Sequence, residues 1–147
     1  FVTAIAGILD VRTGEMELCS AGHEAPILLH SSAPPCALTM TGGPPLCILE
    51  HFAYPADRIR LQSGDLLLMM TDGVTEAQDA AQTLYGLARV MAYCSTIQDE
   101  SEQRSVLAVC QGLYDDVKRF VRDAEPFDDI TIMAIRFTAS ASSTLLA

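Results

Sequence analysis

The apolar residues at the start of the chain occur in short runs that turn residues separate. Phe1–Asp10 and Glu15–Ser20 are two such runs, and Arg12-Thr13-Gly14 between them predicts the turn of a hairpin. The first run is apolar on both faces, as expected for a strand inside a sandwich. Pro26–His30 predicts a short third strand, and Gly42-Gly43-Pro44-Pro45 predicts a loop.

Further along the chain, the spacing of apolar residues changes from that of strands to that of helices. Asp57–Leu61 alternates polar and apolar residues, whereas Leu66–Met70 (LLLMM) is apolar throughout and predicts a strand buried on both faces. Three- and four-residue spacing then predicts helices at Leu84–Tyr93 and Ser101–Asp123. Asp129–Phe137 (DITIMAIRF) predicts a final strand.

The order of these elements, strands followed by helices and one last strand, predicts an α+β fold with antiparallel pairing. On the longer helix, Val109, Leu113 and Val117 belong to the apolar stripe. Asp115 and Asp116 are expected on the polar side of this helix, in contact with solvent.

Composition and charge limit the possible functions of the chain. Its 147 residues include nine basic and nineteen acidic ones, which gives a net charge of −10. Half of the residues are apolar, which is typical of a single folded domain. Nucleic acids and anionic membranes attract basic surfaces, so neither is expected as a partner. The charge is compatible with cation binding.

The cysteines indicate the cellular compartment, and the first residues indicate whether the chain is part of a longer polypeptide. Five cysteines without a C-x-x-C pair predict reduced, mostly buried thiols in a cytoplasmic protein. No apolar run is long enough to span a membrane in this segment. The chain starts at Phe1 within a predicted strand, so we expect a piece of a longer polypeptide. Residues 1–137 are expected to fold, and residues 138–147 to form a flexible tail.

Two acidic segments lie beside predicted strand ends. Asp72 and Gly73 follow the buried strand, and Glu76 shares a face with Asp72 if the chain turns helically there. A carboxylate at this position suits a metal ligand, but an Asp there can also cap a helix. Asp128 and Asp129 open the last strand, where an Asp can simply belong to a turn. Two carboxylates converging from two strands would form half of a Mg²⁺ or Mn²⁺ site.

Taken together, the segments AGH at 21–23, GGPPL at 42–46, SGDLLLMMTDGVTEA at 63–77 and FDDIT at 127–131 resemble a known family. They are similar to the C-terminal part of metal-dependent protein serine/threonine phosphatases of the PPM (phosphatase 2C) family, in the bacterial SpoIIE/RsbU-like branch. The resemblance implies two antiparallel sheets packed as a sandwich and flanked by helices. The N-terminal strands of that fold would be missing.

The resemblance also implies a chemistry and assigns residues to it. Two Mn²⁺ or Mg²⁺ ions would activate a water molecule that attacks phosphoserine or phosphothreonine. Asp72 and Asp128 match catalytic metal ligands, and we also place Gly73 and Glu76 at the metal site. His23 lies near a position where the wider family carries an acid. Asp129 is expected to be a neighbour of the site and not a ligand.

The family's remaining metal-binding Asp, in a motif like GDVSGHG, has no copy in the 147 residues. Two functional hypotheses therefore remain. In one, the chain belongs to a phosphatase acting on a phosphorylated signalling protein, typically an anti-sigma-factor antagonist. In the other, it is a catalytically incomplete module that acts in binding or regulation. Strand edges exposed by a truncation would also favour self-association of the fragment.

Overall fold

The computed structural model describes residues 1–30, 32–98, 104–124 and 128–138. These residues form two antiparallel sheets. The three-stranded sheet has the order β1 (Ala4–Leu9), β2 (Glu15–Ala21), β5 (Asp57–Arg60). The four-stranded sheet has the order β4 (Cys36–Ala37), β3 (Ile27–Leu29), β6 (Leu66–Met70), β7 (Ile132–Arg136). The predicted tail falls mostly on residues 139–147, which lie outside the described residues.

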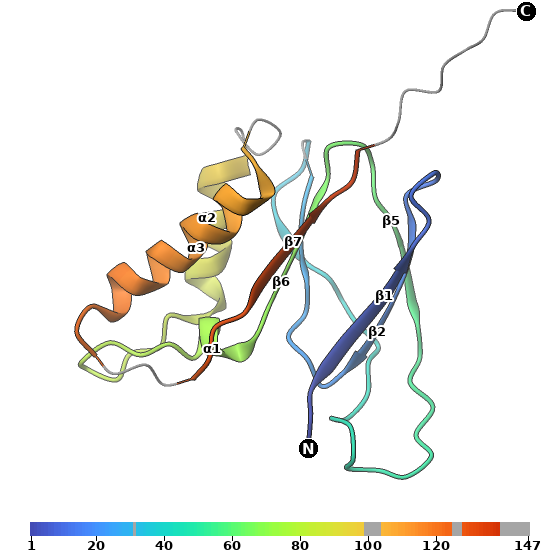
Figure 1. The fold of residues 1–147 in the computed structure, drawn as a ribbon, viewed down its shortest axis with the longest axis horizontal. Helices are drawn as coiled ribbons and strands as arrows, with labels where there is room; N and C mark the ends of the chain where they lie inside the picture. The colour runs from blue at the N-terminus through green and yellow to red at the C-terminus, as the bar shows by residue number, and fades with distance from the viewer. Residues whose placement is uncertain (31, 99–103, 125–127, 139–147) are drawn as a thin grey trace, which may run out of the picture.

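Three layers make up the molecule. The short helix α1 (Asp72–Thr75) follows β6, and two longer helices, α2 (Gly86–Ile97) and α3 (Val106–Val121), come before β7. Figure 1 shows α2 and α3 beside the four-stranded sheet, with the three-stranded sheet on that sheet's other side. The predicted α+β fold with antiparallel sheets and helices is confirmed.

Strand β6 is the centre of the molecule because both of its faces are buried. Leu66, Leu68 and Met70 pack against the helices, in a core that also contains Val90 and Leu113. Leu67 and Met69 point the opposite way and pack between the two sheets with Met16, Leu18 and Phe137. The apolar run therefore forms the strand that the sequence predicted, and it is buried along its whole length.

Helix α3 is fixed by a capped start and an apolar stripe. The hydroxyl of Ser105 accepts a hydrogen bond from the backbone N–H of Ala108, which satisfies a donor that the first turn leaves open. Val109, Leu113, Val117 and Val121 are its buried residues. The helix starts five residues after its predicted first residue. Residues 101–103, where the prediction began, lie outside the described residues.

Three sequence-based expectations are wrong in detail. Strand β1 lies at the edge of its sheet, and Ile8 is 76% exposed, so the strand is not enclosed on both faces. Of the five free cysteines only Cys94 is buried, where desolvation raises its pKa to about 12. Asp116 is half-buried and accepts a hydrogen bond from Tyr85, so it does not simply face solvent. The two-residue strand β4 was not predicted, since it lacks any alternating pattern.

A buried carboxylate connects the start of β6 to β3. Asp65 is 1% exposed, and one of its oxygens lies 2.8 Å from Nδ1 of His30. The other oxygen accepts a hydrogen bond of 2.7 Å from the backbone N–H of Gln62. The backbone oxygen of Asp65 accepts from the N–H of Phe137, which joins the end of β7 to the same corner. This corner lies at the opposite end of β6 from Asp72.

Candidate functional site

The two acidic segments identified in the sequence meet where β6 ends and β7 begins. The backbone N–H of Thr71 donates to the carbonyl of Thr131, and the N–H of Thr131 donates to the Thr71 hydroxyl, both at 3.0 Å. The same hydroxyl donates to the carbonyl of Asp129 at 3.2 Å. Thr71 therefore extends the β6–β7 ladder by one pair and aligns the segment of Asp72 with the segment of Asp128.

Gly73 is the point of closest approach between these two segments. A Cβ atom on Gly73 would lie 2.9 Å from the carbonyl carbon of Asp129 and closer still to its oxygen. It would also be 3.5 Å from the carbonyl carbon of Asp128. Only a residue without a side chain allows the backbones to approach in this way. The glycine in the Asp72-Gly73 pair thus has a packing role, and its assignment to the metal site stays a prediction.

We expect Gly73→Ala to destabilise the fold, because the added methyl group would meet backbone atoms that cannot rotate away. The cost should be about 2–3 kcal/mol, typical of overpacking a buried position. Urea unfolding would measure it. Gly86→Ala is the matched control: Gly86 has φ +74 but open space around it, so only the backbone strain of about 1 kcal/mol applies. Equal losses in the two variants would contradict the packing role.

Asp72 begins the single helical turn of α1. The N–H of Glu76 donates to the carbonyl of Asp72 at 2.7 Å, so Asp72 and Glu76 lie one turn apart, as the sequence predicted for a helical continuation. The N-cap residue is Thr71, and it makes no capping bond through its side chain. The alternative that Asp72 caps this helix is therefore wrong. Its exposed carboxylate remains available for a ligand.

Asp128 and Asp129 lie before β7 and not within it, because the strand begins at Ile132. Both are exposed. One carboxylate oxygen of Asp128 accepts a hydrogen bond of 2.7 Å from the N–H of Asp129. Together with Gly73, Tyr114 and Lys118, the two aspartates line a hollow of about 200 Å³. The expectation that these aspartates open the last strand is therefore wrong by three residues.

His23 lies on the same side of the site as Asp72. The two residues line a hollow of about 210 Å³ with Thr3 and Glu24. The His23 ring is 3.3 Å from the Thr3 hydroxyl, and its backbone N–H donates to the Ser20 hydroxyl at 3.2 Å. Glu24 was not singled out from the sequence. It faces the Thr75 hydroxyl of α1 at 3.5 Å, and its place directly after His23 could have indicated it.

These residues supply oxygen donors of the kind that Mg²⁺ and Mn²⁺ prefer, so the donor type fits such an ion. Their number is small. In the described part of the chain, no group of three or more His, Cys, Asp or Glu side chains could hold a metal ion. Asp72 and Asp128 can therefore contribute part of a ligand shell, and the metal roles of Asp72, Gly73, Glu76 and Asp128 stay predictions.

Comparison with known proteins identifies the fold around these carboxylates. Residues 1–138 match the family described as Stage II sporulation protein E (SpoIIE). The chain belongs to the SpoIIE family. The resemblance inferred from its motifs is thereby confirmed, because the matched range contains both acidic segments, the AGH turn and the GGPPL loop.

The SpoIIE-family chain resembles proteins from several bacteria. It is 26% identical over 135 residues to Protein IcfG from Synechocystis, covering 92% of this chain and 20% of that protein. The RsbU and RsbW domains of Rv1364c from Mycobacterium tuberculosis match 93% of this chain and 36% of that one, with 26% identity and a TM-score of 0.74. The PP2C phosphatase domain of SpoIIE from Bacillus subtilis, with a fragment of its regulatory domain, matches at 19% identity and a TM-score of 0.73.

The match to the PP2C phosphatase domain of SpoIIE from Bacillus subtilis covers 94% of this chain and 38% of that structure. The chain thus has the fold of a PP2C-type phosphatase domain, and it spans between about a fifth and two fifths of the length of these relatives. Within the residues that the structure describes, no helix is long and apolar enough to cross a membrane.

Proposed function

We propose that this chain is the C-terminal part of a metal-dependent protein serine/threonine phosphatase that acts in the bacterial cytoplasm. The observation that carries the proposal is the meeting of Asp72-Gly73 with Asp128-Asp129 at the adjoining ends of β6 and β7, in a chain of the SpoIIE family. The hydrogen bonds of Thr71 and the close approach at Gly73 hold the two segments in a fixed relation, which a metal-dependent enzyme requires.

In this proposal Asp72 and Asp128 hold Mn²⁺ or Mg²⁺, and Glu76 lies at the edge of the same site. When bound, two such ions supply an activated water molecule and neutralise charge on the phosphate. Two solved structures of similar fold support this choice of metal. One is the SpoIIE phosphatase domain presoaked with Mn, and the other is RsbX in complex with magnesium. The chain's own contribution is to orient the two carboxylates through Thr71 and Gly73.

The substrate in this proposal is a phosphoserine or phosphothreonine on a protein of a signalling pathway, with an anti-sigma-factor antagonist as the first candidate. The resemblance to the SpoIIE/RsbU-like branch motivates this choice. Its support is the M. tuberculosis protein that carries RsbU and RsbW domains, to which this chain is 26% identical.

Hydrolysis of p-nitrophenyl phosphate by the natural gene product that carries this chain would test the proposal. We expect turnover with Mn²⁺ or Mg²⁺ and loss of turnover when a chelator removes the metal, because the nucleophilic water needs the ion to ionise near neutral pH. Turnover that the chelator leaves unchanged would contradict the metal-dependent mechanism.

A second candidate function is favoured by one observation: the described residues contain no complete metal-ligand group. The chain would then be a phosphatase-fold module that acts by binding. In that case the natural product remains inert with either metal. The self-association predicted from exposed strand edges is independent of this choice and stays a prediction; β1 lies at a sheet edge.

A further inference from the structure

Residues 41–56 form a loop that packs on itself before β5 begins. Figure 1 shows this loop at the same end of the sheets as the N-terminus. Its two ends are joined, because the backbone N–H and the hydroxyl of Thr41 donate to the Asp57 carboxylate at 2.8 and 2.6 Å. Within the loop, the Phe52 and Tyr54 rings meet edge to face with their centroids 4.8 Å apart. A closed loop packed by its own side chains keeps a defined shape, and such loops are frequently functional.

The same loop exposes large apolar side chains to solvent. Leu46 and Phe52 are each 37% exposed. Between them in the sequence, Ile48 and Leu49 are 54% and 55% exposed. We call these four side chains the apolar patch. Large apolar side chains that gather on a surface in this way mark a site of interaction with another molecule.

The backbone of the patch is held in conformations that its residues disfavour. Cys47 has a φ of +67 and His51 a φ of +59, in the left-handed region that favours glycine. These two residues flank Ile48 and Leu49 in the sequence. Strained residues persist only where surrounding contacts hold them, and they concentrate at functional sites. The strain is thus a second observation, beside the exposed side chains, that favours a function for this loop.

Two contacts fix the loop against the AGH turn and the start of the chain. A Cβ atom on Gly22 would lie 2.8 Å from carbon atoms of the Pro45 ring, so the glycine permits this close approach. The backbones of Val2 and Leu46 are paired by hydrogen bonds of 2.8 and 3.4 Å. The patch is therefore anchored beside the turn that carries His23.

The AGH turn links the patch to the candidate site. Its His23 lines a hollow of about 210 Å³ together with Asp72. A protein whose phosphorylated residue reaches Asp72 thereby brings its neighbouring residues within reach of the patch. Apolar and aromatic side chains form the buried centre of protein–protein interfaces, which is the kind of surface that the loop offers.

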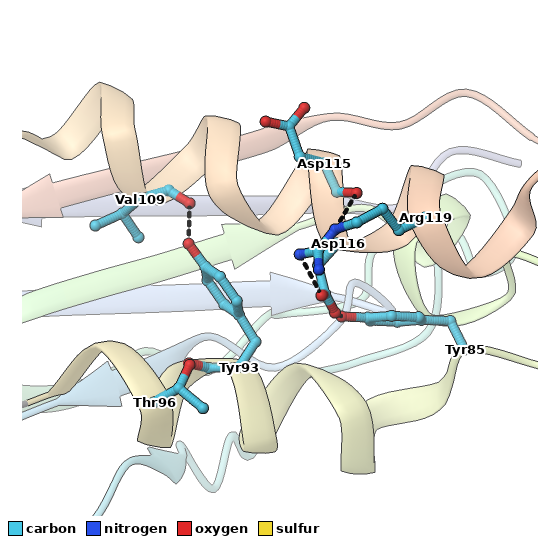
Figure 2. Close-up of polar contacts among 7 residues, drawn as sticks. All are labelled: Tyr85, Tyr93, Thr96, Val109, Asp115, Asp116 and Arg119. Atoms are coloured by element: carbon cyan, nitrogen blue, oxygen red, sulfur yellow. Dashed lines mark hydrogen bonds and ion pairs between the residues drawn. The ribbon is translucent and has the colours of Figure 1, made fainter.

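The surface between α2 and α3 is of a different kind, because its polar groups bind one another. Figure 2 shows the Tyr93 hydroxyl bonded to the carbonyl of Val109. The Asp116 carboxylate accepts hydrogen bonds from both Tyr85 and Arg119. The contacts of the two tyrosines join the helices, so these side chains serve the fold and need no partner molecule.

We propose that the apolar patch docks an apolar segment of the phosphoprotein substrate. The inference rests on the proposed function, since the substrate is the molecule that has to reach Asp72. The net charge of −10 repels a phosphorylated protein, whereas apolar contact is independent of that charge and supplies attraction. Because the loop keeps its shape before binding, little conformational entropy is lost when the segment docks.

Fluorescence anisotropy with two rhodamine-labelled phosphoserine peptides tests the proposal. Leucines flank the phosphoserine in one peptide, and serines replace them in the other. The natural gene product that carries this chain is used with a chelator present, so that neither peptide is hydrolysed. We expect the leucine peptide to bind at least about tenfold more tightly, because its side chains leave water at the patch. In the variant I48S/L49S this preference should fall to within about twofold, since two apolar side chains are removed.

The matched control is the variant V11S/L107S. It removes two apolar side chains that are 70% and 76% exposed, outside the 41–56 loop. Val11 lies in the turn between β1 and β2, at the other end of β1 from the patch. This variant should keep the preference for the leucine peptide. Equal loss of the preference in both variants would overturn the proposal.

Three further results bear on the occupant of the patch. Lack of any preference in the unaltered protein overturns the proposal. Sedimentation may show a dimer that I48S/L49S converts to a monomer while the preference is unchanged; the patch then binds a second copy, and the proposal is wrong. If I48S/L49S fails to fold, a peptide carrying photo-leucine is crosslinked to the unaltered protein. Crosslinks within residues 46–52 support docking, and crosslinks elsewhere overturn it.

The binding measurements are separable from the test of the proposed function. A protein that prefers the leucine peptide but hydrolyses no p-nitrophenyl phosphate with Mn²⁺ or Mg²⁺ contradicts the phosphatase proposal and leaves a docking surface. A protein that hydrolyses p-nitrophenyl phosphate but shows no preference contradicts the docking proposal alone.

Discussion

Asp72→Asn is expected to lower metal-dependent kcat/KM by about two to three orders of magnitude. An amide oxygen carries no formal charge and binds a hard cation more weakly than a carboxylate does. Metal ions contribute several kcal/mol to the barrier, and each 1.36 kcal/mol corresponds to about tenfold in rate. Hydrolysis of p-nitrophenyl phosphate with Mn²⁺ measures the loss, using the natural gene product that carries this chain.

The structure offers a matched control for this variant. Asp123 is an exposed aspartate just past the end of α3, and Asp123→Asn should leave the rate within about twofold. Mn²⁺ should also raise the melting temperature of the unaltered protein by more than that of Asp72→Asn, because a ligand stabilises the state that binds it. Unchanged activity and an unchanged Mn²⁺ effect in Asp72→Asn would exclude Asp72 as a ligand.

Asp65→Ala is expected to give the largest loss of stability, about 3–4 kcal/mol. The substitution removes a carboxylate that is 1% exposed and leaves His30 and the Gln62 N–H without their acceptor. Both contacts are partly buried, so water replaces the lost carboxylate only incompletely and the cost is large. Urea unfolding of the variant measures the loss as a lower midpoint at an unchanged slope.

Asp57 provides the control for this effect. It also accepts two hydrogen bonds, from the backbone N–H and the hydroxyl of Thr41, but these bonds are exposed to solvent. Water can replace them, so Asp57→Ala should cost less than about 1 kcal/mol. Comparable losses in the two variants would show that burial of Asp65 does not determine its contribution.

The sequence predicted the central strand well because local and tertiary requirements agree there. Five consecutive apolar residues at Leu66–Met70 suit a strand covered on both faces, and the structure places one core on each side of it. The apolar stripe of α3 was likewise readable, since Val109, Leu113 and Val117 recur at helical spacing. In both elements, the pattern itself reflects the surface that becomes buried.

The exposure of some side chains and their contacts could not be predicted from the sequence, because they depend on which other element packs against them. Ile8 is as apolar as Ile5 and Leu9 of the same strand, which pack against the core between the sheets. It points to the opposite face of β1, where it is 76% exposed. Asp116 looks like a surface acid on α3, and only the approach of α2 supplies the Tyr85 hydroxyl that it binds. A residue's own helix or strand does not specify what lies opposite it.

The candidate site also combines features that the sequence predicted with features that depend on packing between elements. By itself, the sequence determined the family, the buried strand that precedes Asp72 and the second acidic segment at Asp128, because motif chemistry and apolar patterning are local properties of the chain. Only the tertiary structure decided that Gly73 lies against the backbone of Asp129 and that Glu24 joins His23 and Asp72. These juxtapositions arise from packing between elements distant in sequence, which short-range patterns do not encode.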